Sequence, residues 1–183
     1  MTGAASARNG MRLAAVQKPM DFFRTAVAAA ALAALPVFPS VTGHDLNGRT
    51  LQLPKDLAGD VDLLFIAFVR GQQADVDTWK NFADAAQKNH PNLKVYEVPV
   101  LARGISLMRG FIDGGMRNAI KTDAARAATV TLYIDKEQFR HALDIPSEDR
   151  ITVLLIKRDG TVLWKATGPY DAAKPPDIDA LLK

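Results

Sequence analysis

The stretch VDLLFIAF at residues 61–68 is a nearly continuous apolar run that includes β-branched and aromatic side chains. A run of this kind is typical of a strand covered on both faces, as the central strands of a layered α/β sheet are. Residues 72–90 follow with apolar side chains spaced three and four apart, which predicts one long amphipathic helix. The next strand is expected at 93–98, parallel to the first through a right-handed crossover, with Pro99 at its end or at a sheet edge.

The segments on either side predict further elements of the same domain. Residues 41–53 contain two short alternating stretches around Asn47-Gly48, a dipeptide suited to a hairpin turn. Asp135 is a suitable N-cap for a helix through Leu143. Further segments are expected as strands at 130–134, 151–156 and 161–166 and as a last helix after Pro176. This order favours an α/β domain with a central mixed sheet flanked by helices, an N-terminal hairpin and a helical insertion at 101–128.

The first 36 residues have the layout of a secretory signal peptide or hydrophobic leader, and residues 37–183 form the expected domain. A basic stretch through Arg24 precedes the apolar run TAVAAAALAAL at 25–35, and Ala31 and Ala33 form an A-x-A cleavage site. A retained anchor, a surface helix and a mitochondrial transit peptide are alternatives, and Met11 or Met20 could be the true start. We therefore expect an exported protein, periplasmic or membrane-associated, with a mitochondrial location as the alternative.

The net charge of +3 does not indicate a nucleic-acid partner. Residues 1–33 contain four basic side chains and one acidic side chain, whereas residues 34–183 contain 19 of each sign. A neutral domain does not offer the basic face that phosphate backbones require. The histidines lie on different predicted elements, so no metal site is expected, and no cofactor motif is present. Trp79 and Trp164 are expected to be core or half-buried residues and not a stacking platform.

Several short motifs resemble the thioredoxin-like superfamily over about residues 38–183. They are the hairpin pattern P-x-x-x-G-x-D-L-N-G-x-x-x-x-L from Pro39 to Leu53 and the later D-G-x-x-x-W from Asp159 to Trp164. The resemblance implies a redox cysteine pair near Gln73 and Val76 and a cis-proline near Ile151. The chain has no cysteine. Disulfide exchange and thiolate catalysis need a sulfur nucleophile, so thiol redox activity is excluded.

Other matches resemble the mitochondrial ATP synthase assembly factor family. They are Gly115-Met116-Arg117, the run T-x-x-x-D-x-x-x-F-x-x-x-L from Thr131 to Leu143, and G-x-x-x-W-x-x-x-G from Gly160 to Gly168. This resemblance implies a protein that helps a membrane subunit of the proton channel to assemble and does not catalyse a reaction.

The insertion at 101–128 carries a local charge of +3, from five basic and two acidic side chains, within a neutral domain. Apolar residues alternate with these cations, and basic amphipathic segments bind partner helices or membrane surfaces. The simpler interpretation is a helix that packs its apolar side on the sheet and leaves its arginines in solvent.

The sequence therefore predicts a binding protein, of an assembly or chaperone type, with no enzymatic activity. We expect it to contact a protein partner, such as a membrane-complex subunit, and a membrane surface as a second class of partner. The residues expected to bind the partner are Arg70, Gln73, Arg109, Phe111, Met116 and Arg117. The alternatives are a thiol-independent protein or enzyme that binds a small anionic ligand at the strand-to-helix turn at 70–76, and a structural subunit of a larger assembly.

Overall fold

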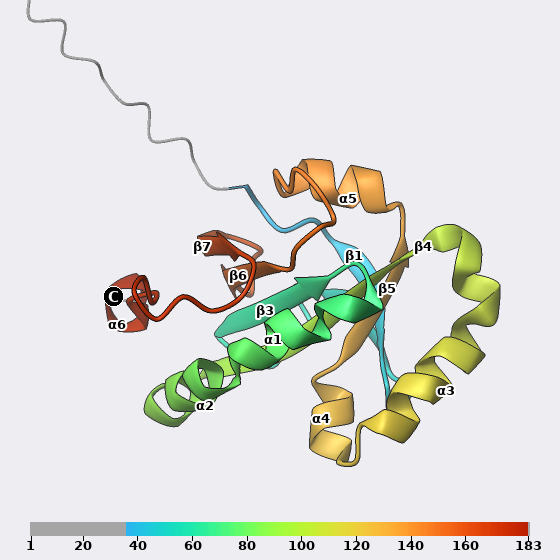
Figure 1. Cartoon of the computed structure of the whole chain (residues 1–183), viewed down its shortest axis with the longest axis horizontal. Coiled ribbons are helices and arrows are strands. Elements are labelled where there is room, and N and C mark those ends of the chain that lie inside the picture. The colour runs from blue at the N-terminus through green and yellow to red at the C-terminus, as the bar shows by residue number, and fades with distance from the viewer. Residues whose placement is uncertain (1–35, 183) are drawn as a thin grey trace, which may run out of the picture. The chain divides into compact units, whose positions relative to one another are not determined.

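The computed structural model describes residues 36–182, so the leader prediction lies almost entirely outside the described residues. Seven strands form one mixed sheet in the order β2-β1-β5-β4-β3-β6-β7, with β3 near its centre (Figure 1). β3 pairs parallel with β4 and antiparallel with β6. The strands are β1 (Val41–Asp45), β2 (Thr50–Leu53), β3 (Val61–Ala67), β4 (Leu93–Ala102), β5 (Val130–Ile134), β6 (Thr152–Lys157) and β7 (Val162–Thr167).

The predicted N-terminal hairpin is confirmed, and its turn is stabilised by Asp45. Gly48 adopts a φ of 91°, which suits glycine in the turn between β1 and β2. The buried Asp45 carboxylate accepts backbone hydrogen bonds from Asn47 (3.0 Å) and Arg49 (2.8 Å), and the Arg49 Nε donates to it at 2.6 Å. Because β1 also pairs with β5, the hairpin extends the main sheet at one edge.

β4 is longer than predicted, and the expectation that Pro99 ends or edges this strand is wrong. The strand runs on to Ala102. Up to Pro99 it pairs with β3, and from Val100 to Ala102 it pairs with β5 on its other side. Pro99 lies where the pairing moves from one neighbour to the other, a place where a proline without an N–H group can be accommodated inside a strand.

The predicted single helix over 72–90 is divided in two at Trp79. A 3₁₀ turn, η1 (Arg70–Gln72), leads into α1 (Gln73–Thr78), and α2 (Lys80–Asn89) follows. The Trp79 amide bonds to the Val76 carbonyl three residues earlier, and its indole N–H donates to Gly168 at 3.0 Å. Burial of this indole among four aromatic rings overrides the helical periodicity that the sequence shows.

The remaining helices are η2 (Arg103–Met108), α3 (Arg109–Ala119), α4 (Asp123–Ala127), α5 (Lys136–Ala142) and α6 (Ile178–Leu181). The first three make up the predicted helical insertion. Asp135 caps α5 as predicted, accepting a 2.9 Å bond from the Gln138 amide. The last helix, α6, is a single turn.

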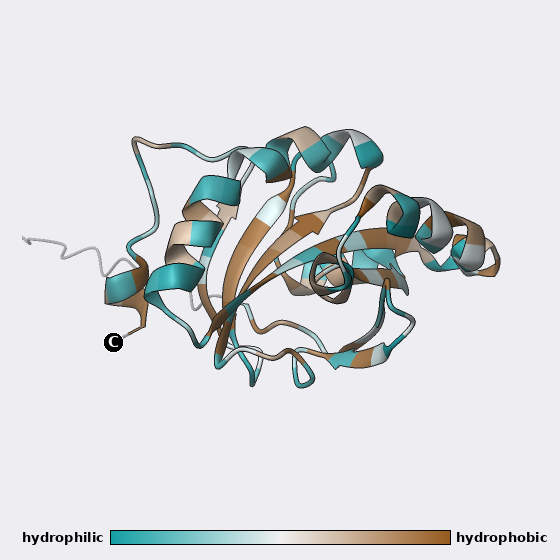
Figure 2. Cartoon of the chain, turned by 90° about the horizontal axis from the view of Figure 1, so that it is seen from below, coloured by the Kyte–Doolittle hydropathy of each residue, from teal (hydrophilic) through white to brown (hydrophobic). Residues whose placement is uncertain are grey.

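Two apolar clusters lie on opposite faces of the sheet. One includes Leu64, Ile66 and Phe139 of α5, and the other includes Leu63, Phe65 and Trp79 between α1 and α2. Figure 2 shows the apolar colour concentrated in the central strands and the polar colour on the outward sides of the helices. The predicted fold class is therefore confirmed, and the division of the chain at residue 36 stays a prediction. Among residues 36–182, no helix has the length and apolarity needed to cross a membrane.

Candidate functional site: the strand-to-helix turn and the groove beside it

The turn between β3 and α1 is closed by the side chain of Gln72. This residue is buried, and its Oε1 accepts hydrogen bonds from the Phe68 amide (2.7 Å) and the Val69 amide (3.3 Å). Its Nε2 donates to the Glu148 carbonyl at 2.6 Å, on the loop that precedes β6. One side chain therefore joins the turn to the loop facing it.

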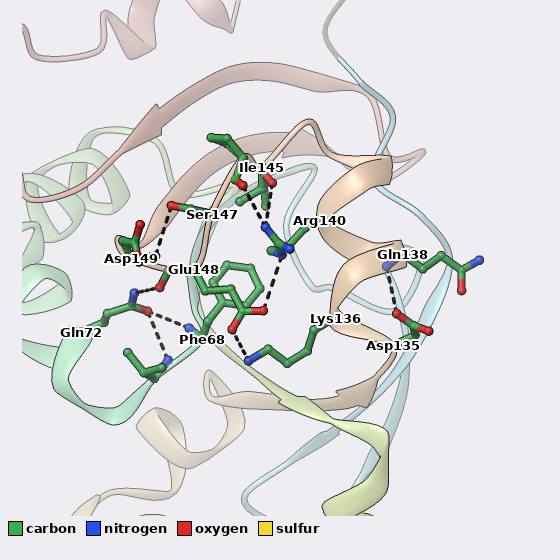
Figure 3. A network of polar contacts seen from close by, with 12 residues as sticks. Phe68, Gln72, Asp135, Lys136, Gln138, Arg140, Ile145, Ser147, Glu148 and Asp149 are labelled. Atoms are coloured by element: carbon green, nitrogen blue, oxygen red, sulfur yellow. Dashed lines mark hydrogen bonds and ion pairs between the residues drawn. The ribbon is translucent and has the colours of Figure 1, made fainter.

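The facing loop is held in turn by a cluster of charges on α5 (Figure 3). The Glu148 carboxylate is paired with the ammonium group of Lys136 and lies 3.5 Å from the Arg140 Nε. Arg140 also donates to the Pro146 carbonyl at 3.0 Å, and Lys136 lies over the Phe68 ring. Glu148 thus connects its loop to α5 and to the turn, a role that sequence spacing could not reveal because its partners lie on two other elements of the fold.

The two positions predicted for a redox pair are occupied by chemically inert groups. Gln73 is exposed at the first residue of α1, where its amide donates to Asp77 at 3.2 Å. Val76 is buried in the apolar cluster beside Trp79. The position expected for a cis-proline is Ile151, which is also buried. The site has the geometry of two facing segments but no group that can exchange electrons.

A groove of about 1310 Å³ opens beside this turn. Its walls come from the α1–α2 segment on one side and from α3 and α4 on the other, and alternate residues of β4 form its floor. Four of the predicted partner-binding residues line it: Arg70 and Gln73 from the first wall and Phe111 and Met116 from the second. The floor presents Val95, Glu97, Pro99 and Leu101.

Glu97 is the one acidic group on the floor of the groove, and the sequence analysis did not select it. Burial raises the pKa of this carboxyl above its usual value, while Lys80 and a hydrogen bond from Gln73 oppose that shift. The sequence does contain a signal for Glu97. On the predicted strand its side chain shares a face with apolar residues, and a carboxylate on an otherwise apolar face is uncommon.

The other two predicted residues, Arg109 and Arg117, do not line the groove. Arg109 contacts the His44 Nε2 at 2.8 Å, and the Arg117 Nε donates to the Leu46 carbonyl at 2.6 Å. Between them, Asp113 accepts a 2.8 Å bond from the Tyr133 hydroxyl. These three residues share one side of α3 and hold it to the hairpin and to β5.

Four large apolar side chains of the insertion are exposed, and Ile112, Met116 and Ile120 are half-buried. No residue of η2 or α3 is fully buried, and the exposed fractions are 97% for Leu107, 81% for Phe111 and 56% for Met108. The simpler interpretation of this segment, a helix packing its apolar side against the sheet, therefore does not describe α3. Among residues 36–182 no cluster of His, Asp and Glu could hold a metal ion.

The structure is similar to several solved proteins with low sequence identity. The exposed lipoprotein thioredoxin Etrx1 from Streptococcus pneumoniae matches at 13% identity, 79% coverage of this chain, 98% of its own and a TM-score of 0.51. A thiol:disulfide interchange protein, DsbE, from Chlorobium tepidum matches at 18% identity, with coverages of 83% and 96% and a TM-score of 0.50. The fold is thioredoxin-like.

BsSco, a member of the Sco family of cytochrome c oxidase assembly proteins, matches at 16% identity, with coverages of 81% and 92% and a TM-score of 0.50. No protein-family model matches the sequence, and the search of curated proteins found no match. The similarity therefore concerns the thioredoxin-like fold. The DsbE protein is described as a thiol:disulfide interchange protein, whereas this chain contains no cysteine and cannot perform thiol–disulfide exchange.

Proposed function

We propose that this chain is a non-redox thioredoxin-like binding protein, of an assembly or chaperone type, that holds a protein partner in the groove between α1–α2 and α3–α4. One observation carries the proposal: the groove is lined by apolar side chains that the domain leaves exposed. Phe111 is 81% exposed and Val69 is 54% exposed, and both line it. Large apolar side chains that are exposed beside one groove are typical of a binding site.

The chemistry of the groove favours an apolar segment of a partner. Ile112, Met116 and Ile120 continue the apolar wall from Phe111, and methionine adapts its shape to varied partners. Arg70 and Lys80 on the opposite wall can form charge-assisted hydrogen bonds with acidic or carbonyl groups at the edge of the bound segment. A helix of a membrane subunit, before it joins its complex, has this apolar character.

The proposed client is a subunit of a membrane complex such as the ATP synthase. The motif resemblance from Gly115 to Gly168 supports this choice, and the signal-like leader supports an exported or membrane-facing location. The fold is compatible with such a role, since one protein that shares it, BsSco, belongs to a family of cytochrome c oxidase assembly proteins. In this proposal the chain binds and does not catalyse.

The test is a crosslinking pull-down from membranes of the native host with tagged full-length protein. Phe111→Ala combined with Met116→Ala removes apolar contact from the groove wall. Val37→Ala is the matched control, because Val37 is 63% exposed and does not line the groove. We expect proton-channel subunits to be enriched by the wild type and the control but not by the double variant, with melting temperatures unchanged. Equal capture by all three proteins would overturn the groove as the binding site.

The alternative, a small anion bound at the 70–76 turn, finds no supporting observation in this geometry. Two amides of the turn, those of Phe68 and Val69, already bond to Gln72, and α1 is only six residues long. A thermal-shift panel of anions against wild type and Arg70→Ala tests it directly. Saturable stabilisation of the wild type alone would favour the alternative over the groove proposal.

A further inference from the structure

The segment that leads from β4 into α3 forms an apolar tip. Six large apolar side chains are exposed among residues 36–182, and four of them lie within seven consecutive positions. They are Ile105, Leu107, Met108 and Phe111, with exposed fractions of 36%, 97%, 56% and 81%. Residues 103–111 are called the tip below.

The tip projects from the domain and lines the groove only at Gly110 and Phe111. The chain leaves the end of β4, turns through η2 and returns along α3 at the margin of the domain (Figure 1). Open space surrounds Gly104 and Gly110, since an added Cβ at either would meet nothing within 4 Å. Leu107 and Met108 do not line the groove, so their exposure needs an explanation of its own.

The charge of the tip itself is positive, and the next acidic side chain along α3 is Asp113. Residues 103–112 contain Arg103 and Arg109 and no acidic side chain. Among residues 36–182, neither guanidinium is paired with a carboxylate; the polar partner of Arg109 is the imidazole of His44. Burial and the nearby Arg109 lower the pKa of His44 while Asp113 raises it, and the net lowering favours the neutral ring beside Arg109.

We propose that the tip binds the surface of an anionic lipid bilayer, inserting Leu107, Met108 and Phe111 at the boundary between headgroups and acyl chains. Arg103 precedes these side chains and pairs with the lipid phosphates, whereas Arg109, held at His44, adds positive charge beside them. Apolar side chains flanked by cations without acids are the combination by which interfacial segments bind anionic membranes. This inference goes beyond the proposed function, because it concerns a lipid partner and, apart from Phe111, side chains that do not line the groove.

A bilayer fits the tip better than a second protein does. A stable protein interface buries about 800 Å² on each partner, with a packed central core. A few side chains that project from one turn cannot supply that area, and each would need its own complementary pocket. A fluid bilayer accommodates isolated projecting side chains without any preformed cavity, and its negative surface potential attracts the arginines.

The absence of native cysteine makes a site-specific test possible in the full chain. Leu107→Cys and, as a control, Val37→Cys are each labelled with the environment-sensitive fluorophore NBD. The labelled proteins are mixed with vesicles of phosphatidylcholine, alone or with about one third phosphatidylglycerol. We expect a blue shift, increased intensity and quenching by spin-labelled acyl chains at position 107 with the anionic vesicles only. The probe at position 37 should remain in water.

A second arm measures affinity by vesicle flotation. Leu107→Ser with Met108→Ser should reduce partitioning into anionic vesicles about tenfold or more, because two inserted apolar side chains are lost. Arg103→Gln should reduce partitioning into anionic vesicles about fivefold and weaken the salt dependence of that partitioning.

If the probe at position 107 stays in water while the protein is bound to vesicles, or if no vesicle binds, the membrane proposal is overturned. If vesicles cause no blue shift at position 107 but a lipid-free protein extract of the host does, the tip is a protein interface and not a membrane-binding surface. In the pull-down, Met116→Ala alone alters the groove wall and leaves the tip unchanged, so it distinguishes failure of the groove proposal from failure of the membrane proposal.

Discussion

Single buried polar side chains decide how the site is built. Gln72 and Gln73 are adjacent in sequence, yet one is 4% exposed and bridges two loops while the other is exposed at a helix start. Gln73 was one of the residues predicted to bind the partner, whereas Gln72 was not. The 3₁₀ turn before α1 sets which of the two points inward, and apolar periodicity carries no information about that turn.

Gln72→Ala is expected to destabilise the domain by roughly 2–4 kcal/mol, because it leaves buried backbone groups at Phe68 and Glu148 without partners. Gln73→Ala is the matched control, since this neighbour is exposed and its side chain makes no bond to a backbone group among residues 36–182, and its effect should stay within about 0.5 kcal/mol. Urea unfolding of both variants measures the difference. Equal effects would mean that the bridge contributes nothing specific.

Asp62 is expected to destabilise the protein at neutral pH. Its side chain is fully buried, its Oδ2 has no hydrogen-bond partner, and burial raises the pKa to about 6. The folded state therefore holds this proton more tightly than the unfolded chain does. The contribution of this tighter proton binding to the free energy of unfolding is fully present below about pH 4. It is lost as the pH rises through 6.

Asp62→Asn should consequently raise the free energy of unfolding at pH 7.5 by roughly 1–3 kcal/mol and flatten its dependence between about pH 4 and 6. The Asn side chain can keep the 3.0 Å bond that Oδ1 accepts from the Gly59 amide. Urea unfolding across this pH range is the measurement. A variant less stable than the wild type at pH 7.5 would show that the buried carboxylate is stabilised by its surroundings.

At the scale of elements, α3 is attached by polar contacts and not by a buried apolar stripe. Arg109, Asp113 and Arg117 recur every four residues and face the hairpin and β5, whereas Phe111 and Met116 face the groove. Helical spacing predicts that the first three share a side. It does not say which side meets the domain, so the sequence analysis grouped two of them with the groove residues.

Acidification should loosen the attachment of α3. A lowered His44 pKa means that the contribution of its contact with Arg109 is present above about pH 6.5 and is lost as the pH falls through the folded pKa. A protonated ring can no longer accept from Arg109 at Nε2, and Asp113 is the nearby charge that favours protonation.

Hydrogen-exchange protection factors of α3, corrected for intrinsic rates, should fall between about pH 7.5 and 5.5, while those of β3 should not. His44→Gln retains an acceptor and removes the titration, so its α3 should show no such change. If the variant keeps the pH dependence, another group is responsible for it.

At the scale of the whole molecule, the described part of the chain contains both apolar clusters of the domain. All buried apolar residues found between 36 and 182 lie at Phe38 or beyond. A thioredoxin-like sheet of seven strands with two covered faces is large enough to be stable without disulfides.

Removal of residues 1–33 should therefore change the melting temperature by no more than about 3 °C. Calorimetry of the full chain and of a chain starting at Ala34 makes the comparison. N-terminal sequencing of the protein exported from its host should give ALPVFPSVTG, the sequence after the A-x-A site. A large loss of stability would mean that the leader packs on the domain.

The sequence by itself determined the α/β class, the hairpin at Asn47-Gly48, the central strand at 61–68 and the absence of thiol chemistry. These depend on local signals, namely alternation, turn residues and the presence or absence of one atom type. Only the tertiary structure decided the break at Trp79, the bridge made by Gln72, the placement of Glu97 in the groove and the exposure of Leu107. Those features depend on which segments meet across the fold, and side chains that are distant in sequence become neighbours only after the chain has folded.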